Sequence, residues 1–173
     1  MNIDDFNKGF RQRGYSVLGK TVDEILSHDD PELSGHIFDA ICQRIIDKDR
    51  RLLTDTERKL REVYKLCGAV GNSGFDLYFS DSYSDGDAEV ALAGLKEMGA
   101  EDLAAVLEHA MGLFPGGKPS KDNSKHEPLL DQLSQESRDV LDDCSMRFSD
   151  LDNVDLAIAY AKKKKADIVL SWP

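Results

Sequence analysis

Hydrophobic residues recur at the spacing of an α-helix along most of this chain. Ile37, Ile41 and Ile45 follow Leu33 at four-residue steps, and other segments alternate steps of three and four residues. Such a stripe places apolar side chains on one face of a helix, and that face is buried when the helix packs. The stripes predict helices near residues 31–45, 54–70, 75–79, 88–98, 103–114, 130–148 and 154–161, with a short helix near 22–27. No segment requires a sheet, so we predict an all-α fold.

Local signals indicate where these helices begin and end. Thr54-Asp55-Thr56-Glu57 matches a capping box, in which the first hydroxyl and the last carboxylate bond each other's backbone N–H groups. Gly71-Asn72-Ser73-Gly74 predicts a turn, and Gly99 is suited to terminate a helix. Residues 113–128, rich in Gly, Pro, Ser and Lys, predict an exposed loop. We therefore expect an arm or irregular segment over residues 1–30 and a single compact multi-helix domain over residues 31–173.

The chain has 173 residues, of which 40% are hydrophobic, and this is enough for one domain to bury a core. No apolar run has the length of a membrane span, and the acidic residues 1–5 do not resemble a signal peptide. Cys42, Cys67 and Cys144 lie far apart without metal-ligand spacing, which favours reduced core cysteines. From these features we expect a cytoplasmic protein. The apolar residues 168–172 are expected to dock as a tail on the body of the domain.

The net charge is −11, from 33 acidic and 22 basic residues. Like charge disfavours direct binding to nucleic acid or to an anionic membrane, and favours a basic partner. Acidity also keeps many proteins soluble, so charge alone does not establish a partner. The charge is uneven: residues 76–108 and 127–155 are strongly acidic, whereas residues 44–65 carry eight basic and five acidic side chains.

The acidic segments supply the candidate partner-binding residues. Duplex DNA carries one charge per about 1.7 Å of its axis, so eleven net charges correspond to roughly 19 Å, or about half a turn. Carboxylates on one helix face recur only about every 5.4 Å, so acids from several elements must combine. The candidates are Asp85, Asp87, Glu89, Glu101, Asp102, Glu136, Asp139, Asp142 and Asp143. The last four are expected on the polar side of one helix, where a solvated face is an equally good interpretation.

Motifs for catalysis or for metal binding are weak. The segment Asp81–Glu89 has some EF-hand spacing, but its third position is Tyr83 and its twelfth is Leu92, so the bidentate glutamate is missing. The four histidines show no metal-binding spacing, and no phosphate-binding or nucleophile motif is present. We therefore expect no enzyme, no metal and no cofactor, although a pocket lined by His36, His109 or clustered acids would favour a hydrolase or metal-dependent enzyme.

The segment Asn72-Ser73-Gly74-Phe75-Asp76-Leu77-Tyr78-Phe79 resembles the signature N-G-G-F-x-Q-Y/F-F of a bacterial family of DNA-mimic proteins. The resemblance continues through residues 91–100, 110–119 and 148–152, and covers roughly residues 53–165. Ser73 replaces the second signature glycine, and Leu77 replaces the glutamine. The fold-signature residues are Asn72, Gly74, Phe75, Tyr78, Phe79 and Gly99.

The resemblance implies a helical fold and a homodimer that binds a basic DNA-binding protein, such as a transcription factor, and blocks its contact with DNA. The signature itself contains a turn and aromatic anchors rather than the acids that would imitate phosphates. The net charge and the resemblance together give the main hypothesis, an acidic protein-binding module that acts as a DNA mimic. The alternative is an immunity-type or other non-catalytic interaction protein that binds through shape and apolar contacts.

Overall fold

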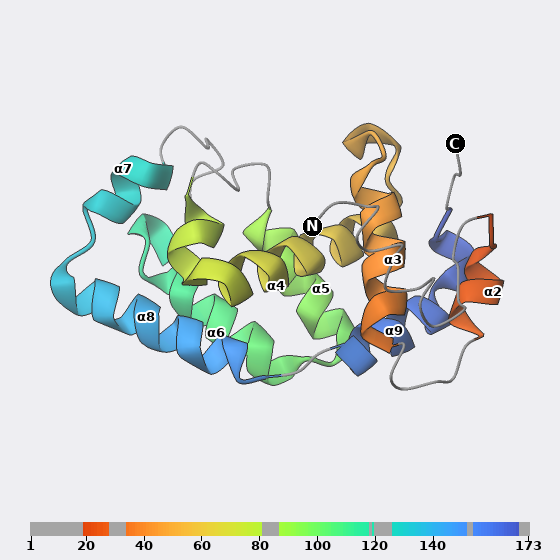
Figure 1. Ribbon diagram of the computed structural model, residues 1–173. Coiled ribbons are helices and arrows are strands. Elements are labelled where there is room, and N and C mark those ends of the chain that lie inside the picture. Colours follow the sequence, from red (N-terminus) through yellow and green to blue (C-terminus); the bar gives the residue numbers. More distant parts are fainter. Residues whose placement is uncertain are drawn as a thin grey trace.

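The computed structural model describes residues 19–27, 34–80, 87–117, 119, 126–151 and 154–169 (Figure 1). Within these ranges the chain forms helices and no strand, so the predicted all-α fold is confirmed. The α-helices are α2 (Val22–Leu26), α3 (Ser34–Ile46), α4 (Asp55–Phe79), α5 (Ala88–Met98), α6 (Glu101–Gly112), α7 (His126–Asp131), α8 (Gln135–Ser149) and α9 (Val154–Lys163). The described residues also form the short 3₁₀ turns η2 (Arg50–Leu52), η4 (Pro115–Gly117) and η6 (Lys165–Asp167).

The long helix α4 is the centre of the molecule and packs against α3, α5, α7 and α8. At one end, α2, α3 and α9 pack together; at the other, α6 and α8 lie side by side, with α7 beyond them (Figure 1). Helix α5 contacts α4, α6 and α9 and so joins the two ends. The acidic segments α6 and α8 therefore share one end of the fold.

The predicted apolar stripes form the core. Ile37, Ile41 and Ile45 of α3 are at most 2% exposed, and Leu107 and Ala110 of α6 are fully buried. Burial of one such large apolar side chain stabilises the fold by roughly 1.5–3 kcal/mol. The spacing of hydrophobic residues thus identified correctly which face of each helix is buried.

The turn predicted at residues 71–74 is instead a kink inside α4. Ser73 has φ −156° and ψ 22°, and Gly74 has φ 77° and ψ −173°, whereas the flanking residues stay helical. The helix resumes because Phe75, Tyr78 and Phe79 are all buried in the core. A glycine is needed at residue 74, because that combination of φ and ψ is essentially restricted to glycine.

The single helix predicted over residues 130–148 is wrong, because the chain forms two helices there. Helix α7 ends at Asp131, and Ser134 has extended backbone angles before α8. The Ser134 hydroxyl accepts the Ser137 N–H at 3.2 Å and so caps the second helix. Asp131, which the single-helix prediction places in the same helix as Glu136, accordingly belongs to α7 and not to α8.

The short helix expected near residues 22–27 is α2, and a capping box between Thr21 and Glu24 begins it. Ile25 and Leu26 are buried in the same core as the longer helices, and α2 packs against α3 and α9. The division of the chain at residue 30 stays a prediction, because residues 1–18 and 28–33 lie outside the described residues.

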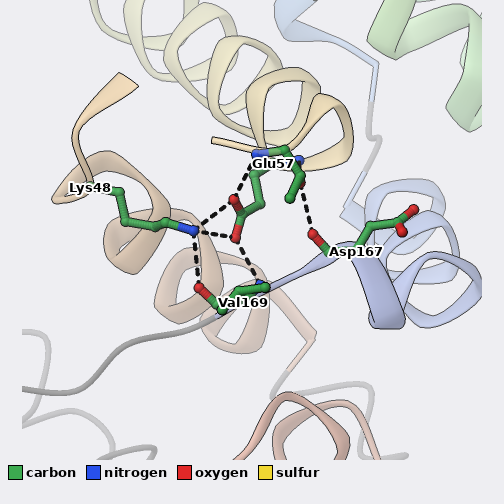
Figure 2. A network of polar contacts seen from close by, with 5 residues as sticks. Lys48, Glu57, Asp167 and Val169 are labelled. Carbon is green, nitrogen blue, oxygen red and sulfur yellow. Dashed lines mark hydrogen bonds and ion pairs between the residues drawn. The ribbon is translucent and has the colours of Figure 1, made fainter. Parts of the chain in front are cut away.

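The capping box at Thr54 extends into a buried polar cluster that holds the tail of the domain (Figure 2). The carboxylate of Glu57, fully buried, accepts from Lys48 Nζ at 2.7 Å and from the backbone N–H of Val169 at 2.8 Å. The Thr54 hydroxyl also donates to the Asp167 carbonyl at 2.7 Å. Ile168 is buried as the docking of the tail predicts, whereas the Val169 side chain is 59% exposed; residues 170–173 lie outside the described residues.

Candidate partner-binding surface

Helices α6 and α8 pack side by side in opposite directions (Figure 1). Cys144 of α8 places its Sγ 3.8 Å from His109 Nδ1, and Leu151, just beyond α8, borders a recess at the first turn of α6. This arrangement brings acids that are distant in sequence to the same end of the molecule.

We define the acidic face as the exposed carboxylates on the outer sides of these two helices and at the end of α8. Six are sequence-predicted candidates, and Asp150 is an acid that the prediction missed. Glu108 of α6 is exposed too, but Lys96 of α5 lies 3.3 Å from its carboxylate, which places it at the margin next to α5. The members are Glu101, Asp102, Glu136, Asp139, Asp142, Asp143 and Asp150.

The charge of the acidic face is largely uncompensated. Among the described residues, its only ion pair is a 3.8 Å contact between Asp143 and Arg147, both of which are more than half exposed. Such an exposed pair contributes about 0–1 kcal/mol and is screened by salt. Asp139 accepts a hydrogen bond from the neutral Gln135 side chain at 2.8 Å. A strongly negative surface therefore remains along α8.

Two other predicted candidates, Asp87 and Glu89, lie away from the acidic face. Asp87 is the N-cap of α5: its side chain accepts the Val90 N–H at 3.1 Å, and its own N–H donates to buried Glu62 at 2.9 Å. Asp87 and Glu89 are half-buried at the start of α5, against α4, and Asp85 lies outside the described residues. The structure thus gives Asp87 a capping role and does not bring it to the acidic face.

The fold-signature residues position α8. At the kink, the Phe75 N–H donates to the Ser145 hydroxyl at 2.9 Å, and that hydroxyl donates to the Leu141 carbonyl at 2.9 Å. A Cβ added at Gly74 would lie 2.9 Å from Ser145 Oγ, so only glycine permits this close approach. The acidic helix is therefore fixed to the bend of α4.

Aromatic packing reinforces the same junction. Phe75 contacts Phe148 of α8 edge-on at a centroid distance of 5.5 Å, and Phe79 contacts Phe114 after α6 at 4.8 Å. Pairs of this geometry contribute about 0.5–1.5 kcal/mol each beyond their buried area. Tyr78 completes the cluster, whereas in the described part of the chain the Asn72 side chain bonds within α4, donating to the Gly68 carbonyl at 2.7 Å.

Gly99 performs the predicted termination of α5 with φ 80°. Its N–H donates to the Lys96 carbonyl at 3.1 Å, and the Ala100 N–H donates to the Leu95 carbonyl at 2.9 Å, which is the Schellman pattern. Because α6 starts directly afterwards, Glu101 and Asp102 occupy its first turn, where the helix dipole favours carboxylates. The same turn thus sets the position of two members of the acidic face.

A second buried ionic cluster was not foreseen from the sequence. Glu62 of α4 is fully buried and accepts from Arg50, Arg61 and the Asp87 N–H. Burial, together with the neighbouring positive charge of Arg61, lowers the pKa of Lys65 to about 8. The cluster ties the start of α5 to α4. No spacing or motif in the sequence distinguishes Glu62 from an exposed helical acid.

The Cys144–His109 contact is unsuited to nucleophilic catalysis, because burial raises the pKa of the Cys144 thiol and a reactive cysteine needs a lowered one. The cysteines at residues 42, 67 and 144 are not paired in disulfides. In the described part of the chain, no group of three or more histidine, cysteine or acidic side chains could hold a metal ion. None of the helices found there is long and apolar enough to cross a membrane.

The fold and the surface define a class of all-helical protein. Its kinked central helix positions a second helix whose acidic side chains are exposed and largely without ion-pair partners. Comparison with models of protein families shows which family the chain belongs to. The chain belongs to the DMP19-like protein family, whose model matches residues 51–164, and this is a family of DNA mimics. The match covers α4 to α9 and confirms the family resemblance expected from the signature. Searches of curated proteins and of solved structures found no match.

Proposed function

We propose that the protein is a DNA mimic that occupies the DNA-binding surface of a basic protein partner through its acidic face. Membership of the DMP19-like family supports a role of this kind. The observation that carries the proposal for this chain is the row of exposed, largely unpaired carboxylates along α8, continued by two more at the adjacent end of α6.

The average number of these carboxylates per unit length is close to that of the phosphates on one DNA strand, although their steps are uneven and Asp143 and Asp150 are seven residues apart. Glu136 and Asp150 are fourteen positions apart, which at 1.5 Å per residue is about 21 Å. One strand of DNA carries a phosphate about every 3.4 Å of axis, so it presents roughly six phosphates over that length. Helix α8 and its end present five carboxylates over the same length, Glu136, Asp139, Asp142, Asp143 and Asp150. In number, these carboxylates therefore approach the charge of one strand, and Glu101 and Asp102 of α6 add to it.

The rigidity of the acidic face favours this function. Its helix is fixed to the α4 kink by Ser145 and by the Phe75–Phe148 contact, so little backbone freedom is lost when a partner binds. Like charges on one helix face cost a few tenths of a kcal/mol each. In a complex, cationic side chains of the partner would offset that repulsion.

The proposal also includes the homodimer implied by the family resemblance, since two acidic faces would cover more of a duplex-binding surface than one. Sedimentation analysis of the purified protein tests this part. A species of twice the monomer mass supports it, and a monomer across the accessible concentration range contradicts it.

The test of function uses the immobilised protein and a lysate of the source cell, at low and at high salt. We expect it to retain a DNA-binding protein that is released by added duplex DNA and by salt, because the contacts are ionic. Neutralising three acids of the face, D139N/D142N/D143N, should weaken binding of that protein about tenfold or more, at roughly 0.5–1 kcal/mol per lost charge contact.

The matched control is D23N/D49N/D55N, which removes the same charge from exposed acids near the α2 end that pair with Lys165, Arg51 and Lys59. This control should retain binding. Retention by the α8 variant, or binding that neither DNA nor salt reverses, would instead support the alternative of an interaction protein that uses shape and apolar contacts.

A further inference from the structure

A small recess lies at one end of the acidic face, between the first turn of α6 and the junction of α8 with α9. Its volume is about 150 Å³, and its lining includes Glu101, Asp102, Leu103, Leu151 and Leu156. A cavity of that size holds one benzene-sized group. The recess therefore has room for a single side chain.

The lining of the recess is apolar on one side. Leu103 is buried at 3% exposure, while Leu151 and Leu156 are 38% and 39% exposed although both are large apolar residues. A single exposed leucine is ordinary on a protein surface. Here two of them, from the α8–α9 junction and from α9, border one hollow next to a buried third. An apolar group placed in the hollow would cover them from water.

The other side of the recess is negatively charged. Glu101 and Asp102 are exposed, and neither forms an ion pair in the part of the chain that the structure describes. Two carboxylates outweigh the partial positive charge of about one half at the start of α6. The recess accordingly disfavours an anion and attracts a cation, and its leucines favour a cation on an apolar stem.

We infer that this recess is the docking site for one arginine side chain of the basic partner, an inference that rests on the proposed function and specifies how the partner is anchored. The arginine methylenes would lie on Leu151 and Leu156, and the guanidinium would donate to Glu101 and Asp102. Arginine fits better than lysine because its planar guanidinium is weakly hydrated and bonds carboxylates in pairs, whereas an ammonium is a strongly hydrated point charge. A second copy of this chain is a poorer occupant, because its own acidic face would face like charge.

Two fluorescent probes, octa-arginine and octa-lysine, test the inference by anisotropy at one low salt concentration. The full chain should bind octa-arginine about tenfold more tightly than octa-lysine. Leu151→Ser and Leu156→Ser should each reduce the preference to about twofold or less and leave octa-lysine binding unchanged. Leu156→Met should retain the preference. Methyl NMR on the full chain adds a direct readout: the Leu151 and Leu156 signals should shift with octa-arginine and not with octa-lysine.

The outcomes separate the inference from the proposed function. If the D139N/D142N/D143N variant loses affinity for both peptides while the serine variants keep the arginine preference, the acidic face stands and the arginine site is overturned. If neither peptide binds the folded wild-type chain, the proposed function fails as well. A change of sedimentation coefficient in the serine variants would show that a second copy covers the recess, and this too overturns the inference.

Discussion

The replacement Glu57→Gln tests whether the buried polar cluster of Figure 2 stabilises the domain. The chain provides a matched control, because it contains two capping boxes of the same form. In one, Glu57 is fully buried and also accepts from Lys48 and from the Val169 N–H. In the other, Glu24 is exposed, and within the described residues its carboxylate accepts hydrogen bonds from Thr21 alone. The two glutamates share a capping role and differ in burial.

The expected cost follows from that difference. Glutamine keeps the size of Glu57 but removes the charge opposite Lys48, whose side chain is only 14% exposed, and it directs an amide donor toward other donors. Removing one partner of a buried ion pair costs about 3–5 kcal/mol. Loss of an exposed cap interaction costs about 0.5–1 kcal/mol. For a chain of 173 residues the midpoint of thermal unfolding falls by about 2–4 °C for each kcal/mol lost. We therefore expect the midpoint to fall by about 6–20 °C for Glu57→Gln and by no more than about 4 °C for Glu24→Gln.

Thermal unfolding followed by circular dichroism at the helical band measures the two midpoints, and urea unfolding at pH 7 measures the two free energies. Lys48→Met should also destabilise strongly, because it leaves the Glu57 carboxylate buried without its cation. The double variant should cost less than the sum of the single variants, with a coupling of about 0.5–3 kcal/mol. Equal free energies of unfolding for Glu57→Gln and Glu24→Gln would refute the reasoning, since burial would then contribute nothing.

Two further perturbations test the kink and the second buried cluster. In thermal unfolding, Gly74→Ala should destabilise the protein by about 2–4 kcal/mol, because residue 74 has φ 77° and the new Cβ would lie 2.9 Å from Ser145 Oγ. Gly68 of the same helix has open space around it, so the control Gly68→Ala should stabilise the protein by about 0.5–1 kcal/mol. Equal effects of the two variants would argue against a strained kink. In the folded chain the pKa of Lys65 is lowered to about 8. Between pH 8 and the ordinary lysine pKa, the unfolded chain therefore binds more protons than the folded chain, and stability rises with pH. After allowance for the partial exposure of Lys65, the free energy of unfolding should rise by about 1 kcal/mol from pH 7.5 to 9.5. Lys65→Met should lose that rise in urea titrations across the same range, and an unchanged slope would show that another group causes it.

Local patterns predicted the helices well because each helix needs one buried face. The range 88–98 was predicted from its apolar positions and from Gly99, and α5 has those bounds. The capping box at Thr54 was also predicted and is present. These features depend on residues within one turn of each other, so they can be recognised without knowledge of the rest of the fold.

The features that sequence reasoning missed depend on distant contacts. The α4 kink is held by Ser145, seventy residues away, and the start of α5 is held by buried Glu62. The break before α8 was missed because Leu133 continues the apolar spacing across it, even though Ser134 is a good cap. For the same reason, the sequence could group acids by helix but could not show that α6 and α8 pack together while Asp87 lies against α4.

The bond from the Val169 N–H to Glu57 has a consequence for biosynthesis. The two residues are 112 positions apart, and ribosomes add about 5–20 residues per second. A nascent chain therefore carries Glu57 for roughly 6–22 s before its last backbone donor has been made. During that interval, of the donors that the structure describes, the carboxylate has Lys48 and the Thr54 backbone, so the first turn of α4 reaches its final hydrogen bonding when translation has passed residue 169.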